Sequence, residues 1–419
     1  MGAANVMRSR PDEEHGRKKI SRSFLDYYLP ILGVFQYYAT GSTGSYGSLV
    51  LYAYAAILLV LNIGRRPLYF HKGLVCFVLY AIVTQPIVYS LYGGFSSGRF
   101  FNYFSVIYIL LVLSVMSNKL NGEVFFKNYL YVGAVCSLVI VFQSVQLYIF
   151  GQKVSGIALL PCDTTNWYAG GDRPCGLFPE PSSYAYYMLP LLVMCLARSK
   201  RIAACLITVC VAMSTSSLGV IGALIVWACY IAKQYDVRYM VVSVIAVFIV
   251  IWGILQTPMG QYAVMKILNT DFVNNPRLTR GFLIFANLDP WQQAFGIGRN
   301  NLDYFISHGL VQLTDYTSTM VSEKNIAYVT SVSAILINYG IVGFAIYFTP
   351  FVLMFVRLKN VRLLIGLFLL LSFVQTMFFD MNFAFLLLII FNQCDLSQDF
   401  WKLGQAGRFK MASGMPERK

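Results

Sequence analysis

The residues best suited to chemistry lie in a polar, turn-rich segment, residues 162–190, which leads from one long apolar stretch into another. Its centre carries Arg173 and Glu180, a cation and a carboxylate seven residues apart beside sequence apolar enough for a membrane. Glycine and proline residues around this pair bend the backbone and restrict its freedom. Because an ordinary connecting loop needs none of these features, this segment is the first candidate for a functional site.

Two polar segments of the chain supply four arginines that are suited to binding an anion: Arg173, Arg277, Arg280 and Arg299. Arg277 and Arg280 are three residues apart after a proline, a spacing that puts both on one face of a helix. The guanidinium fork binds two phosphate oxygens at once and stays charged near lipid. The set predicts a diphosphate site. In the alternative interpretation these arginines pair with nearby acidic residues: Asp163, Asp172, Asp271 or Asp289.

Glu180 lies between two prolines, where the polar segment meets the next apolar stretch. A carboxylate at the edge of a membrane is costly unless it is paired or functional. It is suited to act as a general base toward a sugar hydroxyl, and the alternative is a structural ion pair with Arg173. His308 is a further candidate site residue. The backbone amides of the glycine turn at 296–298 are suited to approach an anion, and the alternative is a plain turn.

Motifs for nucleotide or metal binding are absent from the sequence. It contains no P-loop, no HExxH, no GxSxG and no dinucleotide fingerprint attached to a strand. No acidic pair in the polar segments has the spacing that holds a divalent ion for a nucleotide sugar. The sequence therefore predicts chemistry without a metal or a cofactor.

Two of the nine cysteines, Cys162 and Cys175, fall in the segment that holds Arg173 and Glu180. In an oxidising compartment a disulfide between them would brace this loop, and the alternative is a pair of free thiols. The other cysteines lie in or against apolar stretches, where cysteine behaves as a small hydrophobic residue.

The elements that must position these residues are membrane helices. The 419 residues are 58% hydrophobic and 12% charged, with a mean hydropathy of +0.62, whereas a soluble domain is about a quarter charged. Apolar runs of about 20 residues, long enough to cross a bilayer, recur along the chain. We predict an all-α polytopic membrane protein with about twelve transmembrane helices. The expected spans are residues 24–40, 46–63, 73–92, 102–117, 125–150, 182–197, 202–214, 217–232, 239–257, 331–355, 363–379 and 381–394.

Charge sets the expected orientation of these spans. Residues 1–23 and 395–419 are predicted to be basic cytosolic tails, the first without a cleavable signal peptide, on either side of a transmembrane domain at 24–394. Two long loops, about 151–181 and 258–330, then lie outside. All but eight of the 32 lysines and arginines fall on the cytosolic side. This bias explains the net charge of +14 without invoking nucleic acid.

The block R-x-x-G-L-F-x-E-P-S-x-Y-A at 173–185 resembles the motif of bacterial O-antigen and capsular polysaccharide polymerases of the Wzy type, within the O-antigen ligase/polymerase superfamily. The small-residue turn at 214–222, the glycine pair at 296–298 and the segment 331–343 are similar to that family in order and spacing. The likeness covers about residues 165–350, and the arginine–glutamate block is its most specific part.

This resemblance implies a GT-C-like, metal-independent glycosyltransferase of the bacterial cytoplasmic (inner) membrane, active on the periplasmic face in lipopolysaccharide or capsule biosynthesis. Its substrates would be undecaprenyl-diphosphate-linked oligosaccharides: the growing glycan moves to a hydroxyl of the next lipid-linked repeat unit. The other partners expected are membrane lipid, a flippase and a chain-length regulator. The implied catalytic residues are Glu180, Arg173 and Arg280, and the implied substrate-binding residues are Arg277, Arg299, Tyr184 and His308.

Three other functions compete with this interpretation. The related ligases carry a His-Asn pair about eleven residues before the glycine that matches Gly340, where this chain has Val329 and Thr330, so a polymerase is favoured over a ligase. A flippase or other transporter needs charged residues and broken helices inside the spans, and here Asp26 and Asp380 lie near span ends. A structural scaffold would not depend on the loop arginines.

Overall fold

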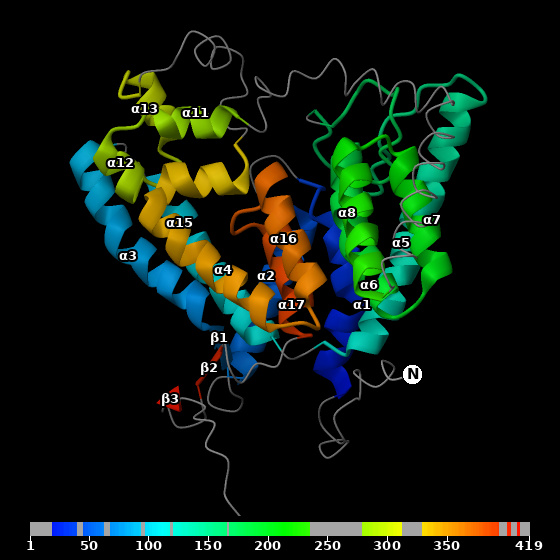
Figure 1. Cartoon of the computed structure of the whole chain (residues 1–419), viewed down its shortest axis with the longest axis horizontal. Helices are drawn as coiled ribbons and strands as arrows, with labels where there is room; N and C mark the ends of the chain where they lie inside the picture. The colour runs from blue at the N-terminus through cyan, green and yellow to red at the C-terminus, as the bar shows by residue number, and fades with distance from the viewer. Residues whose placement is uncertain are drawn as a thin grey trace, which may run out of the picture.

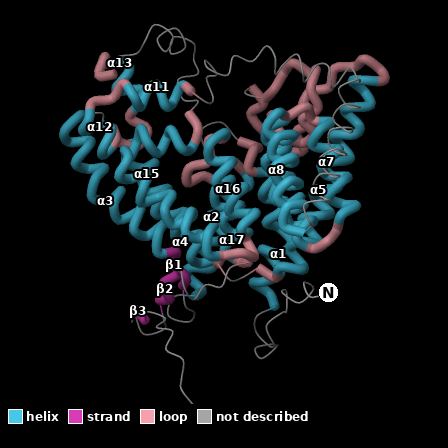
Figure 2. Tube along the Cα trace, in the orientation of Figure 1, coloured by secondary structure: helices cyan, strands magenta, loops and turns pink. Residues whose placement is uncertain are grey.

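The apolar runs of the sequence form helices in the computed structural model of this chain (Figure 1, Figure 2). The structure describes residues 19–39, 45–62, 68–93, 97–117, 120–165, 167–234, 279–311, 329–393, 400–403 and 409–410. In these ranges the fold is mostly helical, with fourteen helices and one small sheet. The predicted helical architecture is confirmed at this level.

Eleven longer helices make up the body of this part of the chain. They are α1 (Lys19–Phe35), α2 (Tyr46–Asn62), α3 (Lys72–Tyr92), α4 (Ser97–Met116), α5 (Gly122–Tyr148), α6 (Pro181–Ala197), α7 (Arg201–Met213), α8 (Ser217–Gln234), α15 (Ser331–Arg357), α16 (Arg362–Val374) and α17 (Met381–Phe391). Each corresponds to one predicted span, and the remaining span, 239–257, lies outside the described residues. The bounds differ by up to five residues at α1, α4 and α16. Helix α16 stops at Val374 rather than 379, because Gln375 adopts an extended conformation and begins a connection to α17.

Three of these helices, α3, α5 and α15, are long and apolar enough to cross a membrane. The other eight contain shorter apolar stretches. Large aliphatic side chains are exposed along α2, α3, α5 and α7, for example Val60, Leu91, Leu138 and Ile202. An exposed apolar surface of this extent is unfavourable in water and is what contact with lipid requires.

Figure 1 shows the helices arranged as two groups with α16 and α17 between them. One group contains α3 and α15 with the short helices α11 (Arg280–Ala286), α12 (Pro290–Phe295) and α13 (Leu302–Ser307), and the other contains α5, α6, α7 and α8. In α6 every residue from Tyr184 to Leu196 is buried, and so are residues 383–391 of α17. Both helices are hydrophobic on all sides, which matches their central position.

A three-stranded antiparallel sheet lies at the opposite end of the molecule from α11 and α13 (Figure 2). Strand β1 (Leu68–His71) pairs with β2 (Phe400–Leu403), with Leu68 opposite Leu403, and β2 pairs with β3 (Phe409–Lys410). Strands β2 and β3 lie within residues 395–419, so part of the predicted C-terminal tail pairs with the segment before α3, and its cytosolic location stays a prediction.

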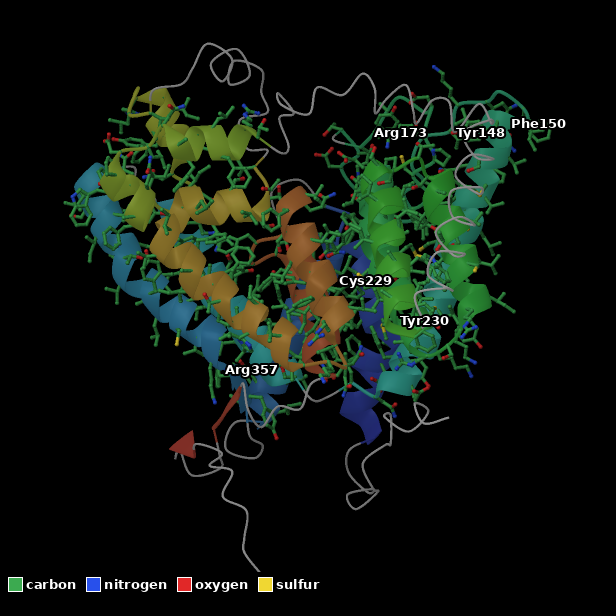
Figure 3. The ribbon with its side chains drawn as sticks, in the orientation of Figure 1. Tyr148, Phe150, Arg173, Cys229, Tyr230 and Arg357 are labelled. Atoms are coloured by element: carbon green, nitrogen blue, oxygen red, sulfur yellow. The ribbon has the colours of Figure 1, made fainter. Side chains whose placement is uncertain are left out.

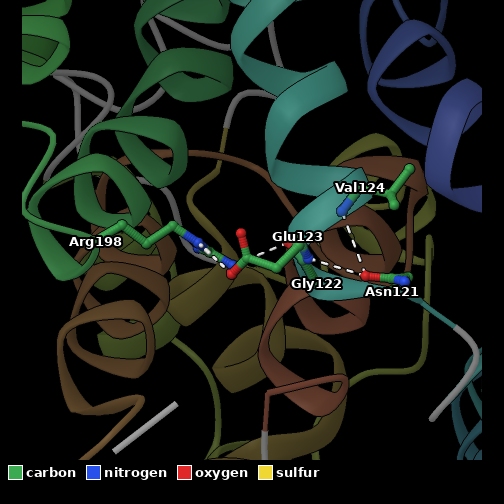
Figure 4. A network of polar contacts seen from close by, with 5 residues as sticks. All are labelled: Asn121, Gly122, Glu123, Val124 and Arg198. Atoms are coloured by element: carbon green, nitrogen blue, oxygen red, sulfur yellow. Dashed lines mark hydrogen bonds and ion pairs between the residues drawn. The ribbon is translucent and has the colours of Figure 1, made fainter. Parts of the chain in front are cut away.

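Polar contacts join α5 to α6 at this same end of the helices (Figure 4). Arg198 forms an ion pair with Glu123 (3.5 Å) and donates to the carbonyl of Gly122 (2.9 Å). The side chain of Asn121 accepts from the amides of Glu123 and Val124, which caps α5. The cation thus lies at the C-terminus of α6 and the carboxylate at the N-terminus of α5, where each is favoured by the helix dipole.

Helix α15 is broken at Gly340. This residue has φ 68° and ψ −175°, a conformation open essentially to glycine alone. In Figure 1 the part of α15 before the break runs across the view, and the part after it descends along α3. The amides of Ile297 and Gly298 donate to the carbonyls of Ile337 and Asn338 (2.9 and 3.2 Å), and thereby satisfy carbonyl groups beside the break.

Candidate functional site

A polar cavity of about 170 Å³ lies where the C-terminal end of α1 meets the beginnings of α6 and α17. Its lining residues are Tyr37, Ser183, Tyr186, Gln375, Thr376, Met377 and Asn382. Six of these seven side chains carry a hydroxyl or an amide group, and none is charged. The cavity therefore offers neutral hydrogen-bonding groups to a ligand.

Two helices begin at this cavity, and a carboxylate precedes each of them. Glu180 is the N-cap residue of α6 and is followed by Pro181, a favoured residue at the first helical position. Its Oε2 accepts from the Ser182 hydroxyl at 2.9 Å. Asp380 is the N-cap residue of α17 and accepts from the amide of Phe383 at 2.8 Å. Both positions suit a negative charge because helix N-termini carry partial positive charge.

The hydroxyls of two tyrosines bind Asn382 across the cavity. Tyr37 donates to Asn382 Oδ1 at 2.8 Å, and Tyr186 donates to the backbone carbonyl of Asn382 at 3.0 Å. The amide Nδ2 of Asn382 lies 3.5 Å from Oδ2 of Asp380. Glu180 and Asp380 both act electrostatically on the Tyr37 hydroxyl. These contacts link the ends of α1, α6 and α17 into one polar cluster.

The connection from α16 to α17 is held in place by the first residue of α15. Ser331 donates its amide and its hydroxyl to the carbonyl of Gln375 (2.9 and 2.7 Å), and its Oγ accepts from the amide of Met377 at 2.7 Å. Thr376 donates to the carbonyl of Val329 at 2.6 Å. The cavity wall at 375–377 is thus fixed by the start of the broken helix.

Asp380 has an unusual environment for a carboxylate. It is half-buried, and the described part of the chain contains no lysine or arginine in an ion pair with it. Desolvation by the surrounding apolar residues raises the pKa of Asp380 to about 6, although its hydrogen bonds with Phe383 and Asn382 act in the opposite direction. A carboxylate with this pKa is a competent proton acceptor near neutral pH.

Arg173 contacts a different part of the molecule from the cavity. Its Nε donates to Oγ1 of Thr215 (3.1 Å) and its Nη2 to the carbonyl of Thr215 (2.9 Å), in the turn between α7 and α8. The guanidinium also lies over the ring of Tyr168. In the described residues Arg173 thus binds Thr215, and no ion pair between Arg173 and Glu180 is seen.

The loop that carries Arg173 and Glu180 is supported from α5 and from the end of α1. Oε1 of Gln143, buried in α5, accepts from the amides of Cys175 and Gly176 at 2.9 and 2.7 Å. The hydroxyl of Tyr38 donates to the carbonyl of Leu177 at 3.0 Å. These contacts, rather than a covalent link, hold the segment.

Of the two alternatives left open by the sequence, the structure has free thiols at both Cys162 and Cys175. Cys175 is fully buried, and its Sγ donates to the carbonyl of Arg173 at 3.3 Å. Burial raises the pKa of the Cys175 thiol to about 12, against the smaller influence of the nearby Arg173 charge. The loop geometry thus keeps the two sulfur atoms in separate environments.

Arg299 borders the cavity wall from the other group of helices. Its amide donates to Oε1 of Gln85 at 2.7 Å, its carbonyl accepts from the hydroxyl of Tyr89, and its guanidinium lies 5.6 Å from the ring centre of Phe378. Phe378 directly follows cavity residue Met377. The glycine turn before Arg299 does not offer its amides to an anion, since those of Ile297 and Gly298 bind α15 and that of Gly296 binds the carbonyl of Gln292.

Arg280 and Arg277 are only partly accounted for by the structure. Arg280 is the first residue of α11 and is buried, and the next residue, Gly281, packs closely against Ser333 of α15. Arg277 lies outside the described residues. The predicted diphosphate site is therefore spread over three regions: Arg173 on the α7–α8 turn, Arg280 beside the start of α15, and Arg299 beside Phe378.

The remaining predicted substrate-binding residues have other surroundings. Tyr184 is fully buried in α6 with its hydroxyl 3.0 Å from Oγ of Ser137, so it does not line the cavity. His308 is exposed at the end of α13, against the ring of Tyr304. In the described ranges no group of three or more His, Cys, Asp or Glu residues is arranged to hold a metal ion.

Comparison with known proteins does not assign the chain to a family. No model of a known protein family matches it, and no curated protein sequence matches it. The functional argument therefore depends on the geometry of the site. That geometry adds Asp380, Asn382, Tyr37 and Ser183, which the sequence did not single out as site residues. The signal available was the pair of polar residues, Asp380 and Asn382, between two apolar runs.

Proposed function

We propose that this chain is a glycan polymerase of a bacterial cytoplasmic membrane. As a metal-independent, GT-C-like glycosyltransferase, it would transfer a growing glycan from undecaprenyl diphosphate to a hydroxyl of a second lipid-linked repeat unit. The observation that carries this proposal is an uncharged polar cavity at the start of two buried helices, α6 and α17, whose N-cap residues are the carboxylates Glu180 and Asp380. An uncharged polar cavity suits a neutral sugar acceptor better than it suits a charged acceptor.

The chemistry needs little beyond positioning and charge neutralisation, because diphosphate is already a good leaving group. Arg173, Arg280 and Arg299 are the described cations available for the donor, and Arg277 completes the proposed set. Because these arginines lie in separate regions of the molecule, a lipid diphosphate with its attached glycan would contact different arginines at different points along the substrate. Glu180 and Asp380 would bind the acceptor.

In the proposed topology both termini are cytosolic, about twelve helices cross the membrane, and the site faces the periplasm. Arg173 lies near one end of the helices and Arg357 near the other (Figure 3), which is the arrangement expected for one outer and one cytosolic arginine. The partners that follow from this function are a flippase that delivers the repeat units and a regulator of chain length.

The alternative functions are less well supported by the same residues. In place of the His-Asn pair of ligases this chain has Val329 and Thr330, and the Thr330 side chain accepts from the Ser333 amide to cap α15. A flippase or other transporter would need a polar path through the helices. The polar cavity described above lies instead at helix ends.

Reconstitution of the reaction tests the proposal. The substrates are the lipid-diphosphate-linked repeat units that accumulate in source cells after this chain is inactivated. We expect the purified protein in lipid nanodiscs to convert them into a ladder of lipid-linked oligomers, and the Arg173→Ala and Arg280→Ala variants to leave single units. Single units after incubation with the unmodified protein would overturn the proposal.

A further inference from the structure

The chemistry of the cavity between α1, α6 and α17 indicates what kind of ligand it takes. Ser183, Thr376 and Gln375 contribute hydroxyl and amide groups to its lining, and Tyr37 and Tyr186 contribute aromatic side chains. Aromatic faces next to neutral hydrogen-bonding groups suit a polyhydroxylated ring. With Glu180 and Asp380 adjoining and no cation in the lining, the same cavity disfavours a phosphate group.

The size of the cavity limits how much of a glycan enters it. Its volume of about 170 Å³ corresponds to roughly six water molecules at ~30 Å³ each, and it is smaller than the ~300–1,000 Å³ pockets that enclose whole drug-sized ligands. It therefore has room for a single sugar ring and not for an oligosaccharide. The acceptor end of a repeat unit is the part that fits.

We infer that this cavity binds the sugar ring that carries the acceptor hydroxyl, and that Asp380 accepts the proton of that hydroxyl. The inference rests on the proposed function and assigns a residue that the resemblance left without a candidate. Asp380 is not itself a lining residue, but it adjoins the lining residue Asn382, whose Nδ2 lies 3.5 Å from its Oδ2, and it keeps part of its surface accessible. Its Oδ1 accepts from the Phe383 amide, and the backbone amides of Asp380 and Asn382 also favour the charged form. A hydroxyl donor at Oδ2 would replace the long contact with Asn382.

The transfer balances with these groups alone. The acceptor oxygen forms a bond to the anomeric carbon of the growing glycan while its proton moves to Asp380. The bond from that carbon to the diphosphate oxygen breaks, and the electron pair leaves with undecaprenyl diphosphate. Release of the proton from Asp380 to water restores the carboxylate. No oxidant, reductant or metal is required.

The surroundings of Asp380 set the pH range in which it is able to act. Its pKa is raised to about 6 by burial, so it becomes ionised, and able to take a proton, as pH rises through 6. The groups on which Asp380 acts electrostatically are the hydroxyls of Tyr37, Tyr52, Tyr186 and Tyr347. Glu180 also acts on Tyr37, and Arg299 acts on Tyr52. Activity is therefore expected to rise between about pH 5 and 7.

The experiment compares Asp380→Asn with Asp303→Asn in the reconstituted reaction. Asparagine is as good an N-cap as aspartate, so the first variant keeps the cap of α17 and loses only the basic group. Asp303 is an exposed acidic residue of α13 and provides the matched control. We expect Asp380→Asn to lower kcat by about 10²–10⁴-fold with KM within threefold, and to remove the rise in rate around pH 6.

A second variant tests the cavity without changing the base. Ser183→Leu should raise the KM for the acceptor at least tenfold and leave the rise around pH 6 in place, because it fills the cavity but keeps Asp380. If Asp380→Asn retains the activity and pH profile of Asp303→Asn while the unmodified protein makes a ladder, the inference is wrong and the proposed function stands. If the unmodified protein makes no ladder, both are wrong.

Discussion

Arg173 shows how a single residue combines charge with a structural role. Its fork donates two hydrogen bonds to Thr215, and these join the polar segment to the turn between α7 and α8. The sequence indicated the arginine but not this partner, because Thr215 is 42 residues away and has no charge to suggest a pairing. A lysine at 173 would keep the charge and lose the two-point contact.

We therefore expect Arg173→Lys to reduce the amount of oligomer ladder in the reconstituted reaction at least tenfold. The substitution removes one of the two hydrogen bonds to Thr215, and a hydrogen bond from a charged donor contributes about 1.5–3 kcal/mol. Arg362→Lys is the matched control. Arg362 also makes two bonds to backbone carbonyls, of Phe355 and Val356, but near the other end of the helices. Gel analysis of the products checks this, and equal ladders from both variants would contradict it.

The carboxylates illustrate what could and could not be predicted at this scale. Glu180 was predictable because it stands in a short polar block between prolines. Asp380 was visible only as an acidic residue near the end of an apolar run. Its proposed role in the site depends on its contact with Asn382 and its electrostatic effect on Tyr37, which hydropathy does not encode. Pairing of Glu180 with Arg173 was one of two alternatives suggested by spacing, and in the structure Arg173 binds Thr215.

Helices were predictable as elements because twenty-residue apolar runs have few other solutions in lipid. The break in α15 was not predictable from the sequence, because residues 331–355 form one continuous apolar span. The break depends on a backbone contact between Gly340 and the segment around Gly296, more than forty residues earlier. A Cβ atom on Gly340 would meet the carbonyl of Ala294, and one on Gly296 would meet the backbone of Asn338. Sequence analysis found both glycines but not their contact.

The glycine contact predicts a large effect from a small change. In Gly340→Ala the new side chain would occupy a conformation that costs about 1–3 kcal/mol for residues other than glycine, and it would also push α12 away from α15. We expect a lower Tm in detergent and loss of the ladder, because Ser331 at the start of α15 holds the cavity wall at 375–377.

Gly122→Ala is the matched control for that variant. Gly122 is the first residue of α5, and a Cβ atom there meets nothing closer than 3.6 Å. The Tm of the Gly122→Ala protein should stay within about two degrees of the Tm of the unmodified protein. A Gly340→Ala protein with unchanged Tm and a full ladder would show that the break is unnecessary for the site.

For the molecule as a whole, the distribution of charge predicts the orientation in the membrane. The segment with Arg173 and Glu180 lies at one end of the helices, while Arg357 and the small sheet lie at the other. Lysine and arginine near the ends of spans are retained on the cytosolic side. The proposed function requires the first end to face outward, where lipid-linked glycans are joined.

Cysteine labelling in intact cells tests this orientation directly. Lys153 and Lys359 are both exposed and lie in connections at opposite ends of the helices. We expect a membrane-impermeant maleimide to label Lys153→Cys in intact cells, and to label Lys359→Cys only after permeabilisation, each measured against the unmodified protein to subtract its own cysteines. The reverse pattern would place Glu180 and Asp380 toward the cytosol, out of reach of substrates delivered to the outer face, and the polymerase proposal would fail with it.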